Sequence, residues 1–192
     1  MKTSPSLEMP WRRRLEVTCP LGGITQAGQV MGRLADMPSR TFTPWRTLGK
    51  FAMVYLLEGA GRYEDQAGAS MEVKAGDLIT VFPTLAHFYG PVRKEDYWRE
   101  IYLVFEGTIF DLWLAQSLLD PRRPVVHLRP VITWQRRLIQ VVDRTPPASL
   151  AGAMAEVCRL QQLLTEILAA TDARHRSGSQ SWIMQARSLL DE

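Results

Sequence analysis

Between residues 51 and 105 the chain consists of short apolar runs, separated by turns that contain glycine, proline or charged residues. Short runs of this kind, bounded by turn residues, are typical of β-strands. The pattern predicts strands over residues 51–57, 62–65, 70–74, 77–82 and 97–105. An earlier strand is expected over 24–31, where Gly28 could interrupt it. Short strands at these intervals favour a sandwich or a barrel.

The pattern changes to a helical period at about Gly107. Helices are expected over 109–119 and 132–142, and the strongest helical pattern begins at Ser149, a suitable N-cap, and ends at Ala170. The chain therefore divides into an arm (1–18), a β-barrel (19–106), a helical region (107–172), a polar linker (173–181) and the start of a further domain (182–192), whose first helix looks incomplete.

Composition indicates an ordinary globular protein. The 192 residues are 46% hydrophobic and 22% charged, which suits one domain with a normal core and appended pieces. The net charge of +3 is too small to indicate nucleic-acid binding by this segment, and the cluster Arg12–Arg14 is expected to belong to a solvated, mobile arm. No run has the length of a membrane span, and Cys19 and Cys158 have neither metal-site nor redox-site spacing. We expect a cytoplasmic protein with free thiols and no membrane contact.

Four stretches together resemble a known family. They are the hairpin Leu57–Tyr63, the strand Ala75–Pro83, its exit His87–Tyr89 and the aromatic strand that ends at Phe105. Over roughly residues 20–192 the chain is similar to the N-terminal sensing and dimerisation half of AraC-family transcriptional regulators. The resemblance implies an α+β, mainly β fold: a cupin-like jelly-roll barrel followed by helices that include a dimerisation helix. It also implies that DNA is bound only through a helix-turn-helix domain, of which residues 182–192 would be the start.

The histidine content argues against a metal site, although many cupins are metalloenzymes. The chain has three histidines, His87, His127 and His175, and only His87 lies where a cupin places a ligand. The earlier strands supply no histidine to pair with it, and one ligand cannot hold a divalent ion. No nucleophile motif, phosphate-binding loop or Cys/His pair occurs elsewhere. We expect no metal, no other cofactor and no enzymatic activity.

The strand at 97–105 is the best candidate for a ligand site. Alternation gives it one face suited to core packing and another that carries Trp98, Glu100 and Tyr102. An aromatic wall with one carboxylate suits a small polar effector, and a carboxylate favours hydroxyl-rich or cationic molecules over anions. The resemblance adds Tyr89, because the family uses this strand and the exit tyrosine to contact the effector. In the alternative interpretation the two aromatic residues only pack and Glu100 faces water.

Three further residues complete the expected ligand site. Arg46 precedes the first long strand, near the place where the family often carries an effector-contacting arginine. Tyr55 is included because alternation could turn it towards the ligand. His87 could donate a hydrogen bond to the ligand, or could be a structural histidine satisfied by the protein itself.

The helix at 149–170 has an apolar face broader than packing on a barrel requires. The surplus could pair with the same helix of a second chain in a two-fold contact, or could belong to the core of a single chain. The residues expected to form a homodimer are Leu150, Met154, Val157, Leu164 and Leu168.

Three functions remain open. The order of barrel, helices, linker and new helix favours a ligand-sensing and dimerisation module of a transcription regulator, in which an effector shifts the arm or the linker between two arrangements. The second possibility is a stand-alone cupin enzyme, an isomerase or dioxygenase, which stoichiometric iron, manganese or zinc would support. The third is an oligomerisation module whose barrel is filled by its own side chains.

Overall fold

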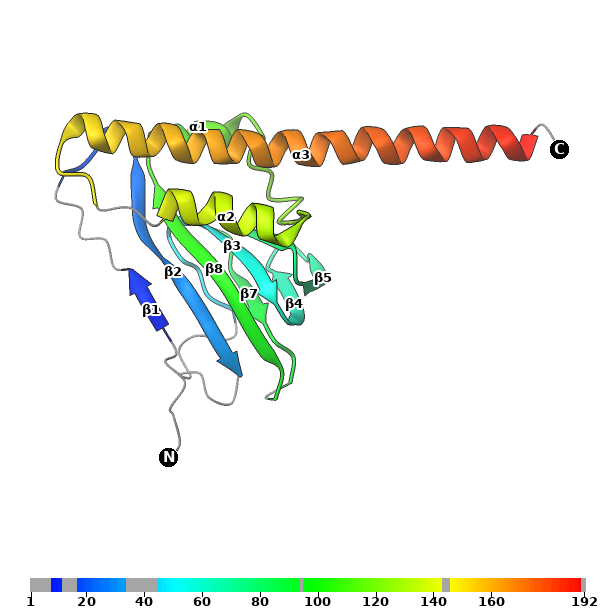
Figure 1. Cartoon of the computed structure of the whole chain (residues 1–192), viewed down its shortest axis with the longest axis horizontal. Helices are drawn as coiled ribbons and strands as arrows, with labels where there is room; N and C mark the ends of the chain where they lie inside the picture. The colour runs from blue at the N-terminus through cyan, green and yellow to red at the C-terminus, as the bar shows by residue number, and fades with distance from the viewer. Residues whose placement is uncertain (1–7, 12–16, 34–44, 94, 143–145, 191–192) are drawn as a thin grey trace.

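The structure of the protein is a computed structural model that describes residues 8–11, 17–33, 45–93, 95–142 and 146–190, with the backbone alone at 8–11, 142 and 174–190. Two antiparallel sheets face each other, and helices cover the outer side of the larger sheet (Figure 1). The long helix α3 crosses the top of this sheet, and its C-terminal part runs on past the barrel (Figure 1). A mainly β, α+β fold was expected, and the structure confirms it.

The larger sheet has six strands in the order β1-β2-β8-β3-β6-β9, and the smaller has three in the order β5-β4-β7. All pairs of neighbouring strands run antiparallel. The strands are β1 Glu8–Trp11, β2 Gly23–Arg33, β3 Phe51–Glu58, β4 Ala60–Asp65, β5 Ser70–Lys74, β6 Asp77–Val81, β7 His87–Gly90, β8 Tyr97–Glu106 and β9 Val125–His127.

The larger sheet separates two apolar cores, and β8 contributes to both. Ile101 and Leu103 point to the helices, where they join the outer core. Trp98 and Val104 point to the smaller sheet, where they join the inner core. Because successive strand residues face opposite sides, a strand that is buried on both sides reads as an almost continuous apolar run. The alternation predicted for this strand is confirmed.

Three helices close the outer core: α1 Thr108–Ala115, α2 Val131–Val142 and α3 Leu150–Leu190. In α2, Trp134 and Leu138 are one turn apart and both are buried against the sheet. In α3, Val157, Leu160 and Leu164 repeat at helical spacing and are buried in the same core. Within the described part of the chain, none of the helices is both long and apolar enough to cross a membrane.

Two glycines allow the start of β2 to lie directly against the end of β8. Gly22 and Gly107 both have φ of 131°, a region that side chains with a Cβ rarely adopt. A Cβ on Gly107 would lie 2.1 Å from the Cα of Gly22, and a Cβ on Gly22 would lie 2.2 Å from the carbonyl oxygen of Glu106. Neither position can therefore carry a side chain without moving the backbone.

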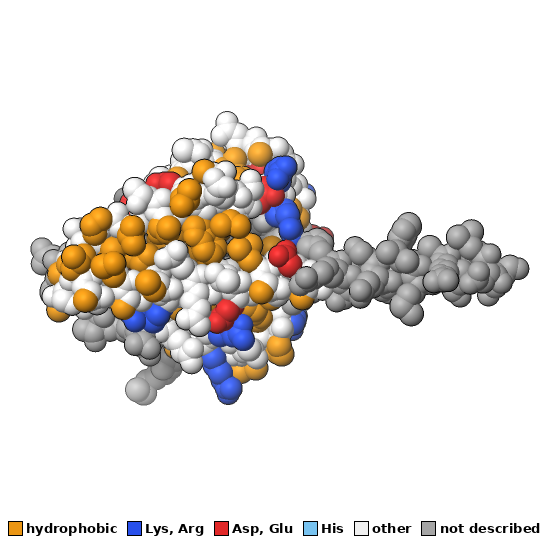
Figure 2. Space-filling view, turned by 90° about the horizontal axis from the view of Figure 1, so that it is seen from above, with side chains coloured by type: hydrophobic (Ala, Val, Ile, Leu, Met, Phe, Trp, Pro, Cys, Tyr) orange, Lys and Arg blue, Asp and Glu red, His pale blue; other side chains and the backbone are white. Residues whose placement is uncertain are grey.

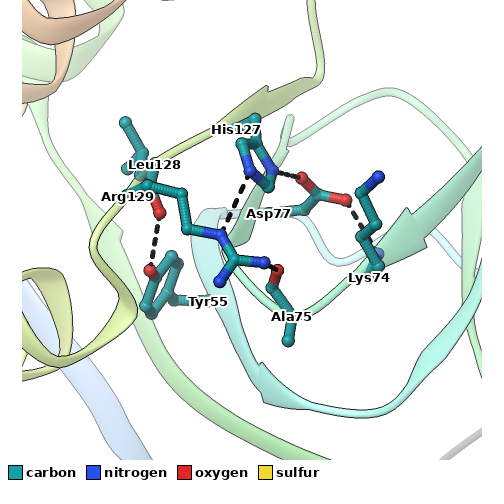
Figure 3. Close-up of polar contacts among 7 residues, drawn as sticks. All are labelled: Tyr55, Lys74, Ala75, Asp77, His127, Leu128 and Arg129. Atoms are coloured by element: carbon teal, nitrogen blue, oxygen red, sulfur yellow. Dashed lines mark hydrogen bonds and ion pairs between the residues drawn. The ribbon is translucent and has the colours of Figure 1, made fainter.

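The Gly-Asp turn before β6 is tied to β9 by a chain of polar contacts (Figure 3). Asp77 accepts a hydrogen bond of 2.7 Å from the backbone amide of Lys74, and its other oxygen lies 2.5 Å from Nδ1 of His127. Arg129 donates from Nε to Nε2 of His127 at 3.2 Å and to the carbonyl oxygen of Ala75 at 2.8 Å. These contacts fix the end of the sheet, so the Asp77 carboxylate has a structural role.

The same contacts indicate which ring nitrogen of His127 carries the proton. The guanidinium of Arg129 can only donate, so Nε2 of His127 must accept with its lone pair. The proton then resides on Nδ1, which donates to Asp77. A neutral imidazole held on both nitrogens by protein groups is not available to a metal or a ligand.

Several expected boundaries differ from the structure. The predicted end of the long helix at Ala170 is wrong, because α3 continues through residues 173–181 to Leu190; a polar stretch without proline can remain helical. The expected arm contains β1, which pairs with β2, although the Arg12–Arg14 cluster lies outside the described residues. The helical region also supplies β9, the edge strand beside β6.

Candidate functional site

Polar side chains gather on the inner face, between the two sheets. The larger sheet contributes Trp98, Glu100 and Tyr102 from β8, and the smaller contributes Tyr89 from β7. Tyr102 is half-buried at the edge of this group, where its hydroxyl accepts a hydrogen bond of 3.2 Å from Nε2 of Gln26 on β2. The predicted grouping of these β8 residues with Tyr89 is therefore present.

Glu100 is the inner-face residue whose ionisation is most strongly perturbed. Its side chain is 2% exposed, and Nε1 of Trp98 donates a buried hydrogen bond of 2.6 Å to Oε2. Burial raises the pKa of Glu100 to about 7, and the Trp98 hydrogen bond and the Arg46 guanidinium oppose that rise without cancelling it. Near neutral pH this carboxyl group can therefore either donate or accept a hydrogen bond. The alternative that Glu100 faces water is wrong.

Arg46 reaches the same region from the segment that precedes β3. Its backbone forms an isolated bridge with His87, in which each amide donates to the other residue's carbonyl oxygen at an N···O distance of 3.0 Å. Its guanidinium donates to the hydroxyl of Tyr89 at 3.0 Å, and its central carbon lies 5.2 Å from the centre of that ring. The pKa of Tyr89 is raised, first by burial and then by the Glu100 carboxylate, so the phenol stays protonated.

His87 is buried beside this group, with 1% of its surface exposed. Nδ1 lies 3.1 Å from the carbonyl oxygen of Leu85, and a carbonyl can only accept, so Nδ1 carries a proton. Burial lowers the pKa of His87 more than this contact raises it, which keeps Nε2 as a lone-pair acceptor. Nε2 is buried and has no hydrogen-bond partner among the described residues. Of the two interpretations of His87, the fully satisfied structural histidine does not fit this nitrogen.

A second buried carboxylate on the inner face, that of Asp65, was not predicted from the sequence. The hydroxyl of Tyr63 donates to Oδ2 of Asp65 at 2.9 Å, and the backbone amide of Ala69 donates to Oδ1 at 3.0 Å. Burial, and then the contact with Asp65, raise the pKa of Tyr63. Alternation along β4 places both side chains on one face, which was a usable signal. This carboxylate is held by the protein's own donors.

Tyr55 does not belong to the site. Its side chain lies on the helix-facing side of β3, in the outer core, and its hydroxyl donates to the carbonyl oxygen of Leu128 at 2.9 Å (Figure 3). The inner face of β3 is formed instead by Ala52, Val54 and Leu56. Successive residues of a strand point to opposite faces, so Tyr55, which lies between the inward-facing Val54 and Leu56, must point outward.

The five residues expected to form the dimer do not share one surface. Val157 and Leu164 are fully buried in the outer core, so they are used within a single chain. Leu168 is half-buried, whereas Leu150 and Met154 are 50% and 44% exposed. The prediction assigned to a second chain the apolar face of α3 that in fact packs on the larger sheet of the same chain.

Exposed apolar side chains do gather on the helical side of the molecule. Figure 2, seen from above, shows hydrophobic groups over the N-terminal half of α3 and the neighbouring helical surface. Besides Leu150 and Met154 of α3, Leu112 of α1 is 51% exposed and Leu118, just after α1, is 43% exposed. The two exposed residues in the first turns of α3, Leu150 and Met154, called the helical patch below, are candidates for a contact with another protein surface.

The described residues contain no group of three or more histidine, cysteine or acidic side chains placed to hold a metal ion. Of the two histidines that the structure describes with their side chains, His127 is held by Asp77 and Arg129, and His87 lies beside Arg46. A guanidinium next to an imidazole disfavours a divalent cation there, because the two cations would repel each other.

Comparison with known proteins gives a family match and several distant structures. A family model described as the AraC-like ligand binding domain matches residues 28–164. Among solved structures, the chain is similar to the protein YhaK from Escherichia coli, with a TM-score of 0.44 and 11% identity over 64% of this chain and 51% of that chain. It therefore spans about half the length of YhaK. A search of the curated proteins finds no match.

Two cupins are also similar to it. The Cnp3 cupin domain from Schizosaccharomyces pombe gives a TM-score of 0.39 and 14% identity, over 54% of this chain and 66% of that domain. An RmlC-like cupin family protein from Methanocaldococcus jannaschii gives a TM-score of 0.36 and 10% identity, over 59% of this chain and 93% of that one. The matched family region includes Arg46, His87 and Glu100, so the inner-face residues lie inside it.

Proposed function

Because the chain belongs to the family of AraC-like ligand binding domains, we propose that it senses a small polar effector between its two sheets and regulates transcription through an attached DNA-binding domain. In this proposal the effector is contacted by Arg46, His87, Tyr89 and Glu100, and by an aromatic wall formed by Trp98 and Tyr102. We propose no catalytic step, because these residues include no nucleophile paired with a base. DNA contact is assigned only to the attached domain.

The observation that supports this proposal best is the buried Nε2 of His87, which has no partner among the described residues. Leaving a buried acceptor unpaired costs about 1–3 kcal/mol. A ligand that donates an N–H or O–H to this nitrogen would recover that free energy. The Arg46 guanidinium and the Tyr89 hydroxyl, which are hydrogen-bonded to each other, lie in the same region.

A direct test measures ligand-dependent stabilisation of the protein. Sugars, polyols, amines and amino acids are screened by thermal shift, and each variant is compared with its own ligand-free form. We expect a binder whose affinity falls at least about tenfold, or about 1.4 kcal/mol, in Glu100→Gln. Glu106→Gln is the matched control, because Glu106 is an exposed residue of the same strand. A binder that ignores the Glu100 substitution would remove this residue from the site, and no binder at all would refute the sensing proposal.

We further propose that two copies associate through the helical patch. A two-fold contact would place Met154 and Leu150 of each copy against the other and bury side chains that are now about half exposed. Light scattering with size-exclusion chromatography tests this: the wild type should be a dimer and Met154→Lys a monomer with unchanged helix content. Ile132→Lys is the control, since Ile132 is an equally exposed apolar residue on α2. A monomeric wild type would refute the proposal.

A further inference from the structure

A groove with polar and apolar lining lies between α2 and α3, which run side by side over the larger sheet (Figure 1). α2 contributes Arg137 and Val141, and α3 contributes Arg159, Leu163 and Glu166. On each helix these positions are three or four residues apart, so they form one stripe that faces the other helix. The groove has a volume of about 200 Å³. An apolar cavity of about 150 Å³ is enough to hold a benzene molecule, so a small organic ligand fits here.

Arg159 is the residue of this groove that the protein leaves unpaired. Its side chain is half-buried, and its Nε is buried without a hydrogen-bond partner among the described residues. None of the ion pairs within that part of the chain includes Arg159. Arg99 also has a buried Nε without a partner, but its Nη1 donates to Glu58 at 2.7 Å, so its charge is compensated. Arg159 therefore has both a donor and a charge to offer to a ligand.

Glu166 does not compensate Arg159, although it lines the same groove. Its Oε2 lies 3.0 Å from Nη1 of Arg137, and its Oε1 accepts a hydrogen bond of 3.2 Å from Nε2 of Gln162. The Arg137 guanidinium also lies against the ring of Trp134, with its central carbon 4.7 Å from the ring centre. Because the Glu166 carboxylate is already engaged on both oxygens, it repels an incoming anion only weakly. One positive charge, that of Arg159, remains in excess.

The rest of the groove is apolar. Val141 and Leu163 are 7% and 3% exposed and belong to the outer core, so they form a floor beneath the charged side chains. An apolar floor supplies contact area, and a charged group at its edge orients the ligand, which is the usual division of labour in a small-molecule site.

We propose that this groove is a second ligand site, which binds a small organic carboxylate with its charged group on Arg159 and its apolar body on Val141 and Leu163. A planar guanidinium matches a carboxylate in shape and charge, and its Nε–H supplies one of two parallel hydrogen bonds. A single excess positive charge suits a monoanion. A phosphate group, with a charge of about −1.5 to −2 near neutral pH, would place surplus negative charge beside Glu166. The site lies on the other side of the larger sheet from Glu100, so this inference is independent of the proposed sensing function.

The first test observes Arg159 directly by NMR in the full chain. A spectrum that correlates each arginine Nε with its proton contains one signal for this residue, which is identified by its loss in Arg159→Lys. Benzoate is the probe, benzamide has the same shape without the charge, and inorganic phosphate has charge without an apolar body. We expect benzoate to shift the Arg159 signal saturably, and to bind at least about tenfold more tightly than either of the other two.

Variants then test the assignment of the charge. Arg159→Gln should weaken benzoate binding at least about tenfold, as measured by calorimetry. Arg136→Gln is the matched control, because Arg136 is an exposed arginine on α2 outside the groove and its substitution removes the same charge. Circular dichroism establishes that each variant is folded. An equal loss in both variants would reduce the effect to general attraction of an anion and would overturn the site.

The remaining outcomes are equally decisive. If benzoate leaves the Arg159 signal unchanged, the groove is not a carboxylate site. If benzamide binds as tightly as benzoate, recognition of the charge is wrong, and if phosphate binds more tightly, the carboxylate class is wrong. Glu100→Gln, on the inner face, should bind benzoate as the wild type does. A loss of benzoate binding in Glu100→Gln but not in Arg159→Gln would place the molecule in the barrel and overturn the inference.

Discussion

The buried carboxyl group of Glu100 predicts an unusual dependence of stability on pH. Its ordinary pKa of 4.5 is raised to about 7 in the folded chain. Between these values the unfolded chain has lost the proton and the folded chain still holds it, so the unfolded state binds fewer protons. Stability therefore falls as pH rises from about 4.5 to about 7, and is constant above that range as far as this group is concerned.

The size of the effect follows from the difference between the two pKa values. At about 1.36 kcal/mol for each pH unit, a carboxyl group with these values costs the ligand-free protein about 3 kcal/mol at pH 8. The group is 2% exposed, so solvent screening removes little of this cost. The Arg46 guanidinium and the Trp98 N–H, which face Glu100, already act in the opposite direction. The phenol of Tyr89, whose pKa is raised, is neutral at this pH and adds no charge.

The substitution Glu100→Gln removes the ionisable group and keeps an oxygen that can accept from Trp98. We expect this variant to be more stable than the wild type by up to about 3 kcal/mol at pH 8, and nearly equal to it at pH 4.5. For a chain of this size, the difference corresponds to a rise in melting temperature of roughly 6–12 °C. Urea denaturation of both proteins at the two pH values measures it.

The control for this prediction is Glu106→Gln, at the exposed end of the same strand. It should change stability by no more than about 0.5 kcal/mol at either pH. If Glu100→Gln destabilises the protein equally at pH 4.5 and pH 8, the carboxylate is compensated in the folded state. The account of its pKa would then be wrong.

Three further substitutions test the structural roles assigned above. Asp77→Asn should destabilise the protein by about 1–3 kcal/mol in urea denaturation, because it weakens the clamp at the Gly-Asp turn; Asp96→Asn, in an exposed loop, should cost less than half of that. Gly107→Ala should prevent folding or cost several kcal/mol in stability, as judged by circular dichroism. Gly68→Ala should cost only about 1 kcal/mol, because the backbone there is similarly strained for a residue with a Cβ, but the added Cβ meets nothing within 4 Å. Tyr55→Phe should lower stability by about 1 kcal/mol and leave ligand affinity unchanged; a loss of affinity without a loss of stability would restore this tyrosine to the site.

The sequence was most informative where hydrophobic and polar positions alternate. In β8 the carboxylate of Glu100 interrupts an apolar pattern, so both faces could be assigned before the structure was known, and the assignment is confirmed. In β3 every residue from Phe51 to Leu57 is buried, so the run contains no polar residue that marks a face. The position of Tyr55 could therefore be decided only by pairing with the neighbouring strands.

Other features depend on contacts that a linear pattern does not contain. The bridge between Arg46 and His87 joins segments that are far apart in the chain, and it is what brings the guanidinium to Tyr89. The apolar face of α3 was visible, but periodicity alone cannot distinguish packing on the chain's own sheet from packing on a second chain. Val157 and Leu164 were misassigned for that reason.

The position of β8 between the two cores gives ligand binding a physical route to the helices. Its inner face carries Glu100, and the next residue, Ile101, is packed in the outer core with α2 and α3. Because both cores are close-packed, a shift of this strand cannot be absorbed on one side alone. A second connection runs through β2, which pairs with β8 along its length and whose Ile24 amide donates to the buried carboxylate of Glu156 on α3 at 3.3 Å. A ligand that binds with different affinity to two positions of β8 would thus also bias the position of α3, which is the condition that allosteric control requires.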